Sequence, residues 1–155
     1  MITKTIKLIF LCICLALLCS CGFKPLTTDD IPKEKYIERI NDTLGTDFVL
    51  KDFDKPYYYY DGGFGDYSLI FSGNPKVNID KFILSLENKG RKYHILDTQK
   101  GVINIQDFGY YAILPKDMEI PKDSICYAWR QDPSLVYIIC YTKDLKTIYF
   151  VEWKW

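Results

Sequence analysis

The most unusual local sequence combines four tyrosines, three glycines and two aspartates between residues 57 and 66. The candidate binding loop within it is Tyr60, Asp61, Gly62, Gly63, Phe64, Gly65 and Asp66. A glycine-hinged loop of this kind can present aromatic rings and two carboxylates to a sugar, a peptide or a calcium ion. The alternative is a hairpin connection, in which glycines supply positive φ angles and tyrosines pack on both faces of a strand. We favour the hairpin.

The spacing of these residues limits the chemistry of the loop. It does not match the D-x-D-x-D-G pattern of a calcium loop, and no Lys-Ser/Thr pair follows to make a phosphate-binding loop. Asp61 and Asp66 form the single local pair of carboxylates that glycoside hydrolysis would need. We therefore expect no metal and no cofactor, and we favour a non-enzymatic function over an enzymatic one.

His94 is the single histidine, and it lies in a strand-like run, Lys-Tyr-His-Ile-Leu. Ser-His-Asp chemistry would have to use it, but the chain has no G-x-S-x-G elbow. A structural role is the simpler interpretation. The three tryptophans, Trp129, Trp153 and Trp155, lie near the end of the chain. They either line a recognition face or complete the core of a sheet, and we favour the core.

The first twenty residues have the organisation of a secretory signal. A basic stretch over residues 1–7 precedes a continuous apolar run over residues 8–18. Even when the run is extended to Phe23 it is 16 residues long. At about 1.5 Å per residue it would span roughly 24 Å, less than the roughly 30 Å of a hydrocarbon core. The length favours a signal peptide over a transmembrane helix.

The end of this signal, Leu18-Cys19-Ser20-Cys21, resembles the lipobox of bacterial lipoproteins, with Cys19 at the position that tolerates variation. The resemblance implies that the Cys21 thiol receives a diacylglyceryl group and that a peptidase cuts before it. The alternative is an uncleaved signal anchor with incidental cysteines. The expected organisation is a signal peptide (1–20), a lipidated tether (21–32) and one domain (33–155).

Lipidation would fix the location of the domain. Two or three acyl chains hold a protein on a membrane effectively permanently. The domain would face outside the cytoplasm in the cell envelope. By the sorting rule of enterobacterial lipoproteins, which the lipobox resemblance brings with it, Gly22 rather than Asp after Cys21 implies the outer membrane of a Gram-negative cell. Without Lys4 and Lys7, 18 basic residues stand against 20 acidic ones. A slightly acidic domain has no long-range attraction for phosphate backbones, so nucleic acid is not an expected partner.

Two cysteines, Cys126 and Cys140, remain after the signal peptide and the lipidated residue are set aside. Their midpoint falls in Gln131-Asp132-Pro133-Ser134, which is a turn signal. In a hairpin closing there, the two cysteines lie directly opposite, about 4.5 Å apart at Cα, which is within disulfide range. We expect a disulfide, with two buried free thiols as the alternative.

Two amphipathic helices are expected. The first runs from Pro32 or Lys33 to Leu44 and stops at Gly45. The second has Asn78 as its N-cap candidate and ends before Gly90. The strands are expected near 47–53, 56–60, 66–72, 92–96, 101–106 and 109–114, followed by a meander near 124–130, 135–142 and 147–154.

These elements predict an α+β fold, with a mainly antiparallel sheet, two helices on one face and a C-terminal three-stranded meander. The layout resembles that of small, uncharacterised bacterial envelope lipoproteins, a likeness that brings no activity with it. The leading hypothesis is a non-enzymatic module that binds a protein or glycan partner near the membrane. The alternatives are a small hydrolase using Asp61, Asp66 and His94, and an inhibitor of a lytic enzyme or toxin that presents the 61–66 turn.

Overall fold

The computed structural model of the protein describes residues 25–155 except 64, 94, 98–101, 106–110 and 116. Seven strands form one sheet in the order β1-β2-β3-β10-β9-β8-β4, and every neighbouring pair is antiparallel. Their bounds are β1 Leu26–Thr27, β2 Phe53–Gly63, β3 Asp66–Pro75, β4 Arg91–Tyr93, β8 Ile125–Asp132, β9 Leu135–Tyr141 and β10 Ile148–Lys154. The predicted α+β class is therefore confirmed.

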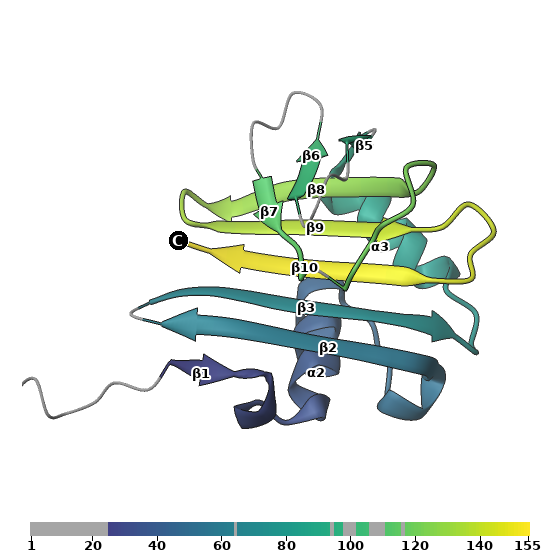
Figure 1. The fold of residues 1–155 in the computed structure, drawn as a ribbon. Helices are drawn as coiled ribbons and strands as arrows, with labels where there is room; N and C mark the ends of the chain where they lie inside the picture. Colours follow the sequence, from purple (N-terminus) through teal and green to yellow (C-terminus); the bar gives the residue numbers. More distant parts are fainter. Residues whose placement is uncertain (1–24, 64, 94, 98–101, 106–110, 116) are drawn as a thin grey trace, which may run out of the picture.

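Two helices cover one face of this sheet, behind it in Figure 1. The first, α2 (Lys33–Leu44), follows Pro32 and ends at Gly45, whose φ of 68° is a left-handed conformation that glycine adopts without cost. The second, α3 (Asp80–Lys89), begins one residue later than expected. The residue directly before the helix is Ile79 rather than Asn78, but Asn78 Oδ1 accepts the backbone N–H of Asp80, the first residue of the helix, at 2.7 Å.

The hairpin of β2 and β3 is longer than the sequence predicted. The expected strand at 56–60 is part of β2, which begins at Phe53, so Pro56 lies inside the strand rather than at its start. The register shifts between Asp54 and Tyr57, and Lys55 has a φ of 48°. This bulge removes Pro56 from the hydrogen-bonded ladder, so the strand continues past a residue that cannot donate.

The C-terminal meander of β8, β9 and β10 was predicted and is confirmed. The predicted strand at 92–96 is instead two strands in different sheets. Residues 91–93 form β4 on the edge of the large sheet, whereas β5 (Ile95–Asp97) pairs with β6 (Val102–Ile105). A further strand, β7 (Tyr111–Ile113), completes this small antiparallel sheet.

Alternation along the strands gives the large sheet two apolar faces. The helix face carries aromatic and aliphatic side chains that pack under α2 and α3 around Phe71, Phe82 and Phe150. The opposite face forms a second cluster around Ile70, Ile138 and Val151. Residues 114–120 cover part of this second face, with Leu114, Met118 and Ile120 buried against it. Every residue of β9 is buried, because both of its faces are covered.

Two stretches differ from their predicted state. The expected strand at 47–53 is an irregular segment followed by a short 3-10 helix, η2 (Leu50–Asp52), and β2 begins only at Phe53. Part of the range 21–32, expected as a tether, belongs to the fold. Leu26 and Thr27 pair with Gly62 and Asp61 as β1, and a 3-10 turn, η1 (Thr28–Asp30), follows.

Candidate functional site

The candidate binding loop is the tip of the β2–β3 hairpin. Asp61 lies opposite Ser68, and Gly63 lies opposite Asp66. Opposite residues in an antiparallel pair project to the same face, as do residues two apart. Asp61, Asp66 and Ser68 therefore share the face turned away from the helices. The turn itself includes Gly65, whose φ of 102° requires glycine, as the hairpin interpretation predicted.

Tyr60 does not belong to this surface. Its ring lies on the helix face, stacked on Tyr67 with a centroid distance of 6.0 Å. Its backbone is bound to Thr28, because the Tyr60 N–H donates to Thr28 Oγ1 at 2.8 Å. Phe64 falls outside the described residues. The described part of the hairpin therefore exposes the carboxylates of the loop on this surface, rather than its aromatic rings.

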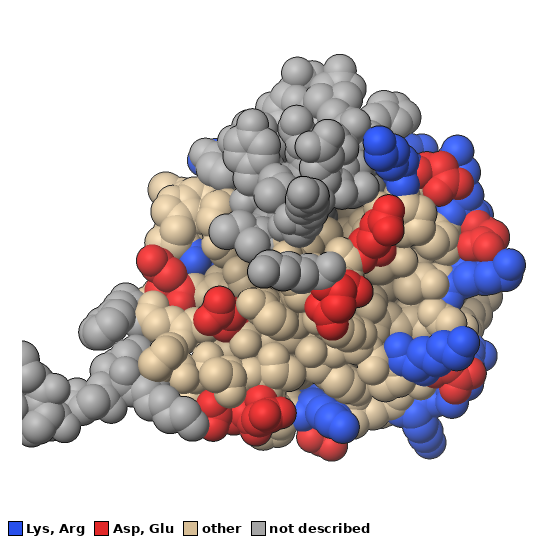
Figure 2. All heavy atoms as spheres, in the orientation of Figure 1, with Lys and Arg blue, Asp and Glu red and all other residues tan. Residues whose placement is uncertain are grey.

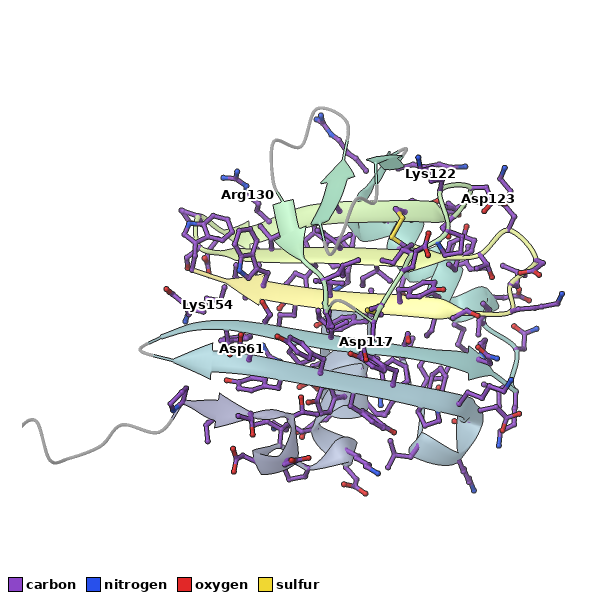
Figure 3. The ribbon with its side chains drawn as sticks, viewed as in Figure 1. Asp61, Asp117, Lys122, Asp123, Arg130 and Lys154 are labelled. Carbon is purple, nitrogen blue, oxygen red and sulfur yellow. A yellow bond between two sulfur atoms is a disulfide. The ribbon has the colours of Figure 1, made fainter. Side chains whose placement is uncertain are left out.

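A shallow depression of about 220 Å³ lies on this surface, open to solvent. It is lined by Asp61, Gly62, Gly63, Asp66, Tyr67, Ser68 and Trp153. Trp153 comes from β10, where it lies opposite Ser68 in the register. The depression thus combines two exposed carboxylates, a hydroxyl and an indole from three neighbouring strands. Figure 3 shows Arg130 of β8 and Lys154 of β10 at the same end of the sheet as Asp61 of β2.

Asp61 is oriented by a tyrosine from its own strand. The Tyr59 hydroxyl donates to Asp61 Oδ2 at 3.4 Å. Burial, and then the charge of Asp61, raises the pKa of Tyr59, which keeps this hydroxyl protonated. Further along β2, the Tyr57 hydroxyl donates to Asp117 Oδ1 at 3.0 Å. Burial and that carboxylate raise the pKa of Tyr57 to about 12. The hydroxyls of β2 therefore serve as donors to carboxylates on this face.

The tryptophans divide between the two predicted roles. Trp129 packs with the core of the helix face, stacked on Tyr137 at 5.2 Å. Trp153 and Trp155 contact each other at 4.8 Å next to the depression, and Trp155 is 39% exposed. The guanidinium of Arg130 lies 5.9 Å from the Trp155 ring. The expectation of a core role holds for Trp129, whereas Trp153 and Trp155 border the candidate site.

Charge is unevenly distributed over the face that carries the depression. In Figure 2 the carboxylates in view are spread over the whole face, including the hairpin end, whereas most lysines and arginines in view lie at the opposite end. That opposite end holds the β9–β10 turn, where Lys146 pairs with Asp144 at 2.9 Å. Asp61 and Asp66 line the depression, and no Lys or Arg is among the described residues that line it, so the depression favours ligands that offer hydrogen-bond donors or positive charge.

Beneath the depression lies a buried ion pair that the sequence analysis missed. Glu152 of β10 is completely buried and faces the helices. Arg39 of α2 donates to both of its carboxylate oxygens, with Nε 3.0 Å from Oε2, and the Tyr67 hydroxyl donates to it as well. The hydrogen bond to Glu152 raises the pKa of Arg39, so the guanidinium stays charged. The sequence feature that could have indicated this pair is the single acidic residue, Glu152, within the largely apolar strand Ile148–Lys154.

The predicted disulfide is present between Cys126 and Cys140. The two residues lie opposite each other in the β8–β9 register, as the turn at Pro133-Ser134 implied. Both are completely buried on the face opposite the helices. The bridge fixes the strand pairing under the second apolar cluster and does not contribute to the depression.

A second hollow, of about 350 Å³, lies beside α2 on the helix side of the molecule. Its floor and far wall are apolar, with Ile37, Phe48, Val49 and Leu50. Its α2 rim carries Glu34, Glu38 and Asp42. No pattern in the sequence indicated this hollow, because the segment after Gly45 was expected to be a strand.

Several predictions concern residues outside the described part of the chain, namely Cys21, Phe64 and His94. Among the described residues, no group of three or more His, Cys, Asp or Glu is arranged to hold a metal ion. No helix in the described ranges is long and apolar enough to cross a membrane. Comparison of the chain with known protein families, with curated proteins and with solved structures finds no match in any of the three.

Proposed function

We propose that this chain is a lipoprotein of the bacterial cell envelope, anchored through Cys21, whose hairpin-end depression binds a protein or glycan partner without catalysing a reaction. The sequence around Cys21 supports the anchor. The observation that carries the binding role is the depression itself. It joins Asp61, Asp66 and Trp153 on one exposed surface.

The path of the chain supports a site close to the membrane. Leu26 pairs with Gly62, so the polypeptide enters the fold beside the hairpin tip. In Figure 1 this entry, the hairpin tip and the C-terminus all lie at one end of the sheet. Cys21 precedes Leu26 by five positions in the chain, and this stretch reaches at most about 18 Å. A lipid on Cys21 would therefore hold the depression near the bilayer, and a partner would have to be available there.

The chemistry of the depression supports a polar ligand with a flat apolar surface. Carboxylates accept hydrogen bonds from hydroxyl, amide or ammonium groups. An indole offers a broad apolar face at low entropic cost, which is why tryptophan is frequent at recognition sites. A sugar ring offers both properties, and so does a protein surface with an exposed lysine or arginine beside an aliphatic side chain.

Site-specific photocrosslinking tests this proposal in cells that produce the lipidated chain. A benzophenone amino acid at Ser68 lies in the depression, whereas the same group at Leu84 on α3 is exposed but distant from it. We expect a covalent adduct from Ser68 and none from Leu84, and we expect Trp153→Ser to remove the adduct. Equal adducts from both positions, or none from either, would contradict the binding role.

One observation favours a hydrolase as the second candidate. Asp61 and Asp66 are diagonal neighbours across the hairpin, and such pairs lie roughly 7–8 Å apart. Inverting glycosidases hold a water between two carboxyl groups roughly 6.5–9.5 Å apart, a separation that side chains on two diagonal positions can reach. Under this alternative, Asp61→Asn and Asp66→Asn would each abolish release of reducing sugar from envelope glycan. Under the binding role, no such release is detectable from the unmodified chain.

A further inference from the structure

The hollow beside α2 has the properties of a preformed docking groove. Phe48 and Ile37 form its floor and are 8% and 3% exposed. Val49 stands at its far wall and is 47% exposed, although most of its apolar neighbours are buried. Its volume, about 350 Å³, is in the range of sites that take a bound group. The described fold leaves this apolar wall in water.

The far wall is held in place without a ligand. The Asn41 side chain donates from Nδ2 to the Phe48 carbonyl at 2.9 Å, and its Oδ1 accepts the Phe48 N–H at 2.9 Å. The same Oδ1 accepts the Thr46 hydroxyl at 2.9 Å. One helix side chain thus fixes the segment that carries Val49. A ligand meets an ordered surface, which lowers the entropic cost of binding.

The rim of the groove is acidic. Glu34, Glu38 and Asp42 lie at four-residue intervals on α2, so successive carboxylates are about 6 Å apart along its axis. Lys35 pairs with Glu38 at 2.8 Å, but both side chains are about half exposed, and such pairs are weak. No basic side chain is among the described residues that line the groove.

We infer that this groove binds a short, basic amphipathic helix of a partner protein. The apolar side chains of that helix fill the hollow between Ile37 and Val49, and its lysines or arginines, spaced four residues apart, pair with the carboxylates of α2. Helix-in-groove recognition of this type places apolar anchors in a hydrophobic cleft. The acidic rim opposes anionic lipid and nucleic acid. This site is separate from the hairpin depression and does not depend on the lipid anchor.

Fluorescence anisotropy with a defined probe tests the groove. The probe is a labelled twelve-residue helical peptide of leucine, alanine and lysine with lysines four residues apart, and its control replaces each lysine with glutamate. The full chain is used as purified from cells, in nanodiscs of neutral phosphatidylcholine if it carries lipid and in buffer if it does not, and empty discs or buffer give the background. We expect saturable binding of the lysine peptide, which weakens as salt rises, and no binding of the glutamate peptide.

Substitutions at exposed positions separate the groove from the rest of the surface. We expect Glu34→Gln combined with Asp42→Asn to weaken binding about tenfold, since each exposed charge pair contributes modestly. Glu87→Gln combined with Asp123→Asn is the matched control, because both residues are exposed and neither lines the groove. Val49→Ser should weaken binding about fivefold. Its control is Val77→Ser, at a site that is 40% exposed elsewhere.

The inference is overturned if the lysine peptide does not bind, or if the groove variants and their controls bind it equally. Binding of the glutamate peptide with the same affinity would also overturn it, because the acidic rim would then select nothing. Self-association of the chain that Val49→Ser abolishes would assign the groove to a second copy of the chain and would equally refute a basic partner helix.

Discussion

At the scale of single residues, the fold depends on one buried charge. Glu152 sits in the most buried strand pairing of the sheet, between β3 and β9, and it has no exposure to water. An isolated carboxylate in such a place is costly, and Arg39 and Tyr67 compensate for that cost with hydrogen bonds. The pair joins α2 to the sheet directly beneath the strands that form the depression.

Removing the charge of Glu152 should therefore destabilise the domain. Glu152→Gln leaves the Arg39 guanidinium facing a neutral amide, and because Arg39 is itself about a third exposed we expect a loss of about 2–3 kcal/mol in the free energy of unfolding. Urea denaturation followed by tryptophan fluorescence measures it. Glu38→Gln, in the exposed pair with Lys35, should change stability by less than about 0.5 kcal/mol. Equal effects of the two substitutions would refute the role of the buried pair.

At the scale of elements, the β8–β9 hairpin combines a two-residue turn, a register shift beside that turn and a covalent bond. Asp132 pairs with Leu135 around Pro133-Ser134, and the Asp132 carboxylate accepts the Ser134 N–H at 2.7 Å. The register then shifts by one residue between Arg130 and Asp132, and beyond this shift Cys126 lies opposite Cys140. The turn, the shift and the disulfide together give the observed pairing.

Loss of the bridge should be measurable in stability and should leave the fold intact. We expect replacement of both cysteines by alanine to lower the free energy of unfolding by about 3 kcal/mol, the value for a loop of about 15 residues. Wild-type protein unfolded in the presence of a reductant should lose a similar amount. If reduction leaves the urea midpoint unchanged, or if both thiols are alkylated in native, non-reduced protein, the structural role of the bridge is wrong.

The Asn41 side chain offers a second test at this scale. Asn41→Ala removes three hydrogen bonds that hold residues 46–48 against α2, and two of them satisfy the backbone of Phe48. We expect a destabilisation of about 2 kcal/mol, together with faster hydrogen exchange at residues 46–50 than at β9. Exchange that accelerates uniformly over the domain would show that the segment is not held locally.

The features that could be predicted from the sequence are those that depend on residues close together in the chain. The helix α2, its buried face and its stop at Gly45 follow from spacing within one turn of helix, and the Cys126–Cys140 pairing follows from one turn. By contrast, the pairing of β3 with β10 joins segments more than seventy residues apart. The contact of Arg39 with Glu152 and the position of Trp153 beside Ser68 depend on that pairing, so no local pattern reveals them.

The same contrast explains the errors. Asn41 holds residues 46–48 in an irregular path through side-chain hydrogen bonds, which an apolar run such as Phe48–Leu50 does not disclose. A bulge at Lys55 lets β2 continue through Pro56, although proline usually interrupts a ladder. In both places, a specific backbone conformation overrode the local residue preference.

At the scale of the whole molecule, the tyrosines make stability sensitive to alkaline pH. Burial raises the pKa of Tyr36 to about 12, and burial together with Tyr127 raises the pKa of Tyr141 to about 12. In the unfolded chain these groups ionise near pH 10. Above that pH the unfolded state releases protons that the folded state retains, so the free energy of unfolding falls as pH rises from about 10 to 12.

Urea midpoints measured between pH 8 and 12 should show this decline. Below pH 9.5, ionisation of the tyrosines should change the midpoint little. The slope of this decline reports the number of protons released on unfolding. Tyr36→Phe should lower that number by about one per molecule, because one strongly shifted group is lost, and the decline should become shallower. A stability that stays constant to pH 12, or a slope that Tyr36→Phe leaves unchanged, would contradict burial of the tyrosines as the cause.

The position of the fold relative to a membrane is the claim on which the proposed function depends. The strand β1 brings the start of the domain to the hairpin end, and a lipid five residues earlier would set the distance between the depression and the bilayer. The most direct test is the intact mass of the protein purified from cells. The account predicts a chain that begins at Cys21 and carries a diacylglyceryl group. A chain that still begins at Met1, or one with an unmodified Cys21 thiol, would contradict it.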